Sequence, residues 1–215
     1  HNVKLPFITL ILMISFASVN AVLFTPALPA IANYFAISTS KAQLTISWFL
    51  VGYAIGQLLY GPISNRYGRK PALYAGILLQ IWSSFLCAFA GIIHIYFVLV
   101  LGRFFLALGA GVGLKMTFTL VNETHDHNHA NQKLSYLLLA FAITPGLSVT
   151  LGGLLSKHFG WESTFYASAV YGILLLFLIA QLPETKSHLD HHALQLKHLS
   201  QSYLTQFKNL QLLAG

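Results

Sequence analysis

The sequence is short of charge, of acidic residues and of cysteine. Asp, Glu, Lys and Arg make up 8% of its 215 residues, against about a quarter in an average soluble domain, which excludes an ordinary soluble fold. Five acids stand against twelve Lys and Arg. These cations lie in gaps between long apolar runs, which excludes nucleic acid as the partner. Cys87 is the only cysteine, so an intramolecular disulfide and a multi-cysteine metal site are excluded.

Apolar sequence is abundant, because 56% of the residues are hydrophobic. A helix needs about 20 apolar residues to cross a bilayer core about 30 Å thick. Six runs of that length predict an all-α polytopic protein, a six-helix bundle embedded in a lipid bilayer. Gly61 and Pro62 are expected to end the second run. The predicted spans cover residues 5–24, 44–63, 72–91, 95–114, 134–156 and 163–182.

Cations in the loops predict the orientation, because Lys and Arg accumulate in short cytoplasmic loops. Nine cations fall on one side of the predicted spans and two, Lys41 and Lys157, on the other. This bias places both termini in the cytoplasm. The nine are Lys4, Arg66, Arg69, Lys70, Lys115, Lys133, Lys186, Lys197 and Lys208.

Arg103 is the remaining cation, and it lies inside the fourth predicted span. Burying its charge costs at least about 3 kcal/mol, so it must face a cavity or a polar partner. Two interpretations are open: a functional group in a transport path, or a structural Arg bonded to backbone carbonyls of neighbouring helices. Ionisable residues inside a membrane usually belong to functional sites, which favours the interpretation of Arg103 as part of a transport path.

Proline and glycine mark places where membrane helices bend or pack closely. Pro26, Pro29 and Pro145 lie in or beside predicted spans, and each frees a backbone carbonyl, which predicts bent helices that move. Gly152 and Gly153 lie in the fifth span, where small residues let helix backbones approach one another.

The loop after the second span reads GPISNRYGRKPAL, from Gly61 to Leu73. In spacing and in nearly every residue it resembles the loop motif of the major facilitator superfamily. Asn65 stands where that motif usually has Asp. Arg69 can bridge to carboxylates or helix ends, and Gly68 is expected to need a backbone angle that a Cβ disfavours. The resemblance implies a conformational gating motif formed by Gly61, Asn65, Arg66, Gly68, Arg69 and Lys70.

Further segments resemble one branch of this superfamily, the drug/proton antiporters of the Bcr/CflA type. They are TPALPAIANYF, GYAIGQLLYGP, LGRFFLALGAGVG and FGWESTF. Members have twelve helices in two six-helix halves. The resemblance implies that residues 1–185 form the N-terminal half, that residues 186–215 form a cytoplasmic linker and the start of a seventh helix, and that a C-terminal half is the missing partner.

The resemblance also implies a function. It indicates half of a secondary transporter in a bacterial inner membrane that exports small amphipathic organic substrates by alternating access, with proton coupling. The implied transport residues are Asn20, Phe24, Tyr53, Gln57, Arg103 and Phe104. No Asp or Glu lies in a predicted span. The alternative therefore stays open: a non-transporting scaffold, or a decayed or truncated homologue, that pairs with another six-helix half.

Enzymatic activity, a cofactor and a metal site are not expected. An intramembrane enzyme needs a nucleophile and a base within hydrogen-bond reach, and no His lies well inside a span. His125, His127 and His129 alternate near Asp126 and could bind a transition metal. Their spacing matches no structural zinc pattern, so we expect a solvated loop. Residues 190–213 fit an interfacial helix or a linker.

Overall fold

The computed structural model describes residues 5–186, 188–195 and 199–205, and within these ranges it contains helices and turns but no strand. Within the described residues, six stretches are long and apolar enough to cross a membrane. The prediction of an all-α, six-span membrane protein is therefore confirmed. The stretches are Phe7–Tyr34, Thr39–Tyr67, Arg69–Ile93, Tyr96–Thr124, His127–Phe159 and Glu162–Ala180.

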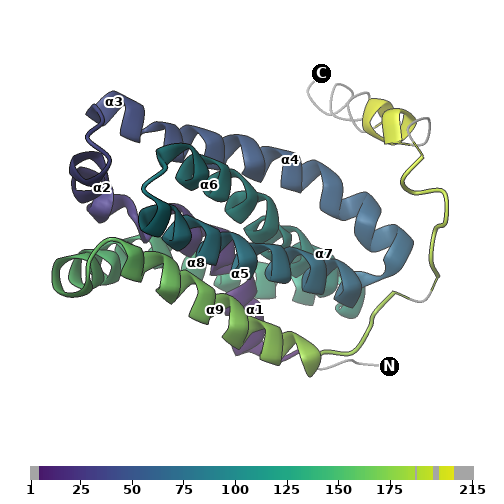
Figure 1. Cartoon of the computed structure of the whole chain (residues 1–215). Coiled ribbons are helices and arrows are strands. Elements are labelled where there is room, and N and C mark those ends of the chain that lie inside the picture. The colour runs from purple at the N-terminus through teal and green to yellow at the C-terminus, as the bar shows by residue number, and fades with distance from the viewer. Residues whose placement is uncertain (1–4, 187, 196–198, 206–215) are drawn as a thin grey trace, which may run out of the picture.

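Several stretches consist of more than one helix. The elements are α1 (Phe7–Val22), η1 (Thr25–Ala27), α2 (Leu28–Tyr34), α3 (Thr39–Ala42), α4 (Leu44–Tyr67), α5 (Arg69–Ile93), α6 (Tyr96–Ala110), α7 (Val112–Thr124), α8 (His127–Phe159) and α9 (Glu162–Ala180). In Figure 1, α2 and α3 lie at one end of the bundle, and the last turns of α4, α7 and α9 lie at the other.

The break after α1 coincides with two of the prolines. Pro26 is the second residue of η1 and Pro29 is the second residue of α2, a position where a backbone N–H would have no partner within the helix. Pro26 also leaves the Val22 carbonyl without a backbone donor, and the Thr25 hydroxyl donates to that carbonyl at 2.7 Å. Pro145, by contrast, lies inside α8, which continues past it.

The expectation that Gly61 and Pro62 end the second span is wrong, because α4 continues to Tyr67. Pro62 removes the backbone donor to the Leu58 carbonyl. The Tyr203 hydroxyl, from a helical segment at residues 199–205, donates to this carbonyl at 2.5 Å. The freed carbonyl is therefore satisfied, and the helix runs on through the proline.

Two further helices extend well beyond their predicted spans. The fourth span was expected to end at residue 114, but α7 reaches Thr124. The fifth was expected to start at residue 134, but α8 begins at His127. The expected histidine loop is accordingly reduced to a short turn, since His127 and His129 lie in the first turn of α8. The predictions that concern residues 187, 196–198 and 206–215, among them the start of a seventh helix, fall outside the described residues.

Close backbone packing holds α4 against α6 and α8 against the end of α1. A Cβ at Gly52 would overlap the Phe104 carbonyl, and a Cβ at Gly152 would overlap the Leu23 carbonyl. Substitution at either position would push two helices apart. Gly153 lies beside Pro26 with more room, 3.8 Å from an added Cβ to the Pro26 Cβ.

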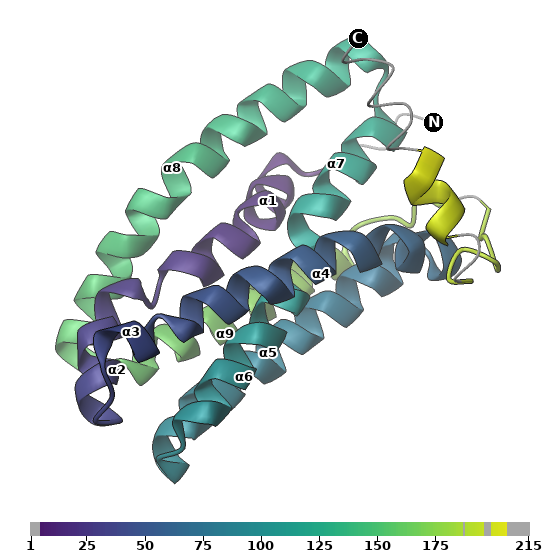
Figure 2. The ribbon, with the colours of Figure 1, turned by 90° about the horizontal axis from the view of Figure 1, so that it is seen from above.

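One face of the bundle is open. In the most apolar part of the second and fifth stretches, 28% and 17% of residues are buried, against 61% in the first and fourth. Figure 2 looks onto this face, with α4 and α8 at its edges and α1 and α7 between them. Large apolar side chains on α4 and α8 are exposed, including Leu58 and Leu147. We call this surface, formed by α1, α4, α7 and α8, the open face.

Candidate functional site

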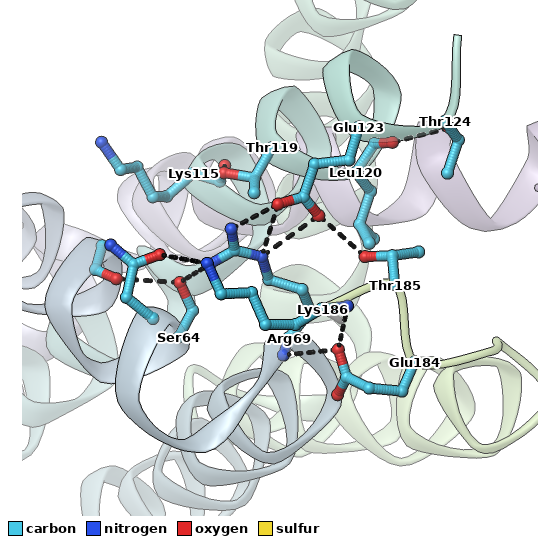
Figure 3. Close-up of polar contacts among 12 residues, drawn as sticks. Ser64, Arg69, Lys115, Thr119, Leu120, Glu123, Thr124, Glu184, Thr185 and Lys186 are labelled. Atoms are coloured by element: carbon cyan, nitrogen blue, oxygen red, sulfur yellow. Dashed lines mark hydrogen bonds and ion pairs between the residues drawn. The ribbon is translucent and has the colours of Figure 1, made fainter. Parts of the chain in front are cut away.

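The residues of the loop motif meet side chains from two other parts of the chain, the end of α7 and the segment that follows α9 (Figure 3). We call this group the motif cluster. It joins the end of α4, the start of α5, the end of α7 and the segment that follows α9. Its members are Ser64, Asn65, Gly68, Arg69, Glu123, Glu184 and Thr185.

Arg69 is the centre of the motif cluster, and its residue is only 6% exposed. Its Nε donates to both carboxylate oxygens of Glu123 at 3.1 and 3.2 Å, and its Nη2 donates to the same carboxylate. Its Nη1 donates to the Ser64 hydroxyl at 2.6 Å and to Oδ1 of Asn65 at 2.9 Å. A planar guanidinium can hold such a set of acceptors at once, which a lysine ammonium cannot do with the same geometry.

A second carboxylate, from Glu184, binds the start of α5. It accepts hydrogen bonds from the backbone N–H groups of Arg69 and Lys70, both at 2.9 Å. Free N–H groups and the helix dipole make this end of a helix a favourable place for an anion. Gly68 allows the turn that brings the two together, with φ at +106°. An added Cβ at Gly68 would lie 2.8 Å from a Glu184 carboxylate oxygen.

The segment after α9 connects to the motif cluster in several ways. The Thr185 hydroxyl donates to Glu123 at 2.8 Å, and the Asp190 N–H donates to the Asn65 carbonyl at 2.9 Å. With the Tyr203 contact, this segment supplies donors to two α4 carbonyls that the helix itself leaves free. A polar cavity of about 250 Å³, lined in part by Lys115, separates this segment from α4 and α7.

The other motif residues lie around this core. Gly61 lies next to Lys115, with 3.5 Å between an added Cβ and the Lys115 Cε. The Arg66 guanidinium lies 5.2 Å from the centre of the Tyr67 ring. Lys70 donates through its ammonium to the carbonyl of Ala180, in the last turn of α9, at 3.1 Å.

Sequence reasoning allowed Arg69 a carboxylate or a helix end as its partner, but it did not identify any particular acid. Glu123 and Glu184 are 54 and 115 positions away in the chain. The small number of acidic residues could have pointed to these two glutamates. Only five acids occur in the sequence, and a buried Arg in the loop needs one of them as a partner.

Arg103 lies in a second site, inside the bundle, and is 1% exposed. Its Nη1 donates to the Asn20 carbonyl at 2.7 Å, its Nη2 to the Ala21 carbonyl at 3.3 Å, and its Nε to the Thr45 carbonyl at 3.2 Å. The Asn20 and Ala21 carbonyls belong to the last turn of α1, where carbonyls lack helical partners and favour a cation. These contacts match the structural interpretation of Arg103, because every hydrogen-bond partner is a backbone carbonyl.

Two aromatic rings complete the Arg103 site. The guanidinium carbon lies 3.8 Å from the centre of the Phe24 ring and 4.2 Å from that of Phe49. Such cation–π contacts stabilise a desolvated cation. Asn20 also links this site to a buried polar group, since its Oδ1 accepts from Gln80 Nε2 at 2.8 Å.

The remaining predicted transport residues lie apart from Arg103. Gln57 donates to the Gly111 carbonyl at 3.0 Å, and Tyr53 is close to Gly111. Phe104 lines an apolar groove of about 440 Å³ between the start of α4 and α6, together with Trp48. Arg103, Asn20 and Phe24 therefore form one buried group, and the other three side chains lie nearer the surface.

The histidine segment forms no metal site among the residues that the structure describes, since these contain no group of three or more potential ligands. His129 contacts the Asp126 carboxylate at 2.5 Å. This hydrogen bond lowers the pKa of Asp126. Both side chains are exposed, with 72% and 66% of their surface accessible, so the pair contributes little to stability.

Comparison with known proteins agrees with this geometry. The sequence profile of the Major Facilitator Superfamily matches residues 9–214. The chain is 28% identical over 188 residues to an "Uncharacterized transporter" of Rickettsia bellii, covering 87% of this chain and 46% of that protein. It is 31% identical over 186 residues to "Multidrug resistance protein MdtL" of Escherichia coli K12, covering 86% of this chain and 47% of MdtL.

A solved structure shows the same fold. The crystal structure of a D-xylose–proton symporter superposes with a TM-score of 0.72 at 16% identity, over 95% of this chain and 52% of that one. The helical bundle and the loop motif define a membrane transporter fold, and the chain belongs to the major facilitator superfamily. It spans about half the length of the curated relatives that it matches.

Proposed function

We propose that this chain is the N-terminal half of a secondary transporter that exports small amphipathic organic compounds by alternating access. The motif cluster is the observation that carries this proposal. One buried arginine, Arg69, ties together α4, α5 and α7 through Ser64, Asn65 and Glu123, and Thr185 adds the segment after α9. A scaffold needs no such hydrogen-bonded junction at a loop between two membrane helices, whereas a transporter needs one that can be made and broken.

The open face supports the second part of the proposal, a partner half. α4 and α8 are the least buried membrane stretches, and relatives such as MdtL are about twice as long as this chain. In this proposal, residues 1–185 form one six-helix half and residues 186–215 lead to the next. The C-terminal half covers the open face, and the substrate passes between the two halves.

The proposed location is a bacterial inner membrane with both termini in the cytoplasm. The structure brings the described cations of the nine-member group to the end of the bundle that carries the motif cluster, and cytoplasmic loops are rich in Lys and Arg. Single cysteines at Lys41 and Lys157 should react with an impermeant reagent added outside intact cells. Labelling of these two sites only after the cells are opened would contradict this topology and indicate the opposite orientation.

We propose that proton coupling uses a carboxylate in the other half. Glu123 is already engaged by Arg69, and Glu162 lies at the first position of α9, at the end of a stretch. A coupling site needs a titratable group that can lose its partner during the cycle. Export driven by a proton gradient, and its loss on adding an ionophore, would be the supporting result.

The test of export is dye retention by cells that produce the full-length protein containing this chain. Cells with the unaltered protein should retain less of a fluorescent amphipathic dye than cells with Arg69→Ala, when both proteins are present in the membrane at equal amounts. Equal retention by both strains and by cells without the protein would favour the alternative, a scaffold that does not transport.

A further inference from the structure

Charged side chains and histidines on the four helices that form the open face are almost all basic. α1 carries none, and α8 carries Lys133, Lys157 and three histidines but no acid. α4 contributes Arg66 alone. The single acid in the four helices of this face is Glu123 on α7, and Arg69 already holds it. The described part of this face therefore offers a cationic substrate no free carboxylate.

A groove lies between α1 and α8, with a volume of about 740 Å³. Small-molecule sites occupy roughly 300–1,000 Å³, so an organic compound of ordinary size fits. Most of the groove is apolar. The apolar lining consists of Phe7, Ile11, Tyr136, Leu139, Ala140 and Ile143.

The polar residues of the groove gather at one end. Lys133 lines it there together with His125, His129 and Gln132. The Lys133 ammonium lies 3.3 Å from Nε2 of His125, which leaves donors free, because an ammonium has three. The nearest acid in the sequence, Asp126, is bound by His129, and no described carboxylate pairs with Lys133.

The shape of the groove fits an elongated ligand with a charge at one end. Ile143 lies ten positions after Lys133 in α8, which corresponds to about 15 Å along a helix at 1.5 Å per residue. An apolar body of this length would lie against the lining, and an anionic group would reach Lys133. A cationic group at the same place would face an ammonium with no acid to offset it, which is costly away from water.

We propose that the transported compound is an amphipathic organic anion whose charged group binds Lys133 at the end of the α1/α8 groove. This inference rests on the transporter function proposed above and gives its substrate class. It also gives Lys133 a role distinct from that of the other cations near the membrane surface.

The test measures binding of three probes with the same ring system to the full-length protein in lipid nanodiscs. The probes are 1-naphthalenesulfonate, the neutral 1-naphthalenesulfonamide and 1-naphthyltrimethylammonium. The sulfonate should bind about tenfold more tightly than the ammonium compound, and Lys133→Gln should weaken sulfonate binding about tenfold, as expected for one hydrogen bond to a charged group. Lys133→Arg should keep most of the affinity, which also shows that the site folds.

Lys157→Gln is the matched control, because Lys157 lies at the other end of α8 and does not line the groove. It should bind the sulfonate as the unaltered protein does. Equal or tighter binding of the ammonium compound, or unchanged sulfonate binding in Lys133→Gln, would overturn the inference.

Flux in proteoliposomes separates this inference from the proposed function. Transport of the ammonium compound with no sulfonate binding would support a transporter and refute the anion class. Lys133-dependent sulfonate binding without flux of any probe would support the anion site and count against transport.

Discussion

Replacing Arg103 by alanine should destabilise the protein, because its side chain holds the last turn of α1. Three N–H groups of its guanidinium bind backbone carbonyls of α1 and α4. Each hydrogen bond to a charged group is worth about 1.5–3 kcal/mol. The substitution also relieves the cost of burying a charge, which amounts to several kcal/mol. The net loss in the free energy of unfolding is then about 3 kcal/mol.

A loss of this size is measurable as a shift in melting temperature. For chains of 150–250 residues, 1 kcal/mol corresponds to about 2–4 °C, so Arg103→Ala should lower the melting temperature by about 6–12 °C. The melting temperature of Arg103→Lys should lie between those of the unaltered protein and Arg103→Ala, because the lysine ammonium keeps the charge but cannot reach all three carbonyls in one plane. Lys157→Ala, at an exposed position, should change it by less than about 2 °C.

Transport measured on the same purified full-length variants decides between the two interpretations of Arg103. The structural interpretation requires that flux and melting temperature fall together. An Arg103→Ala protein with an unchanged melting temperature and no flux would refute the stability argument and assign Arg103 to the transport step. A variant that is both stable and fully active would refute both interpretations.

Three further predictions concern the motif cluster and the segment after α9. Glu123→Gln removes the charge that binds Arg69, so the melting temperature should fall by about 2–4 °C, as expected for about 1 kcal/mol; an unchanged value would show that the ion pair is not formed. Gly68→Val forces a side chain into a positive φ at a cost of about 1–3 kcal/mol, so turnover should slow with little change in substrate affinity; the reverse pattern would contradict a gating role. Tyr203→Phe removes the donor to the Leu58 carbonyl, so amide exchange in the last turns of α4 should speed up, and unchanged exchange would show that the contact does not matter.

The fold was largely predictable because the membrane imposes a simple requirement of length and apolarity. All six spans were identified, yet the ends of α4, α7 and α8 were not. Hydropathy detects the part of a helix that lies in lipid, whereas backbone hydrogen bonding continues into polar sequence. Lys115 and Lys133 were taken as boundaries, and both lie within helices. The helix end predicted at Pro62 was wrong for another reason. The Leu58 carbonyl that Pro62 leaves without a backbone donor accepts a hydrogen bond from Tyr203, about 140 residues later in the chain.

The candidate sites were predictable only in part, for reasons of geometry. The sequence marks Arg69 and Arg103 as cations that need partners. It does not say that Glu123 approaches Arg69 or that the end of α1 approaches Arg103, since these contacts depend on how helices far apart in the chain pack together. The sequence did not predict the α1/α8 groove, because a groove between two helices depends on how they pack and leaves no pattern in the sequence of either helix.

The central claim, transport by alternating access, is tested most directly by counterflow. Proteoliposomes that contain the full-length protein are loaded with unlabelled 1-naphthalenesulfonate and diluted into a trace of labelled compound. A carrier that alternates exchanges one for the other, so label should accumulate transiently inside, above its outside concentration, and Arg69→Ala should reduce the rate. Folded protein that gives no accumulation of label with this probe or with either of the other two naphthalene compounds would contradict the account.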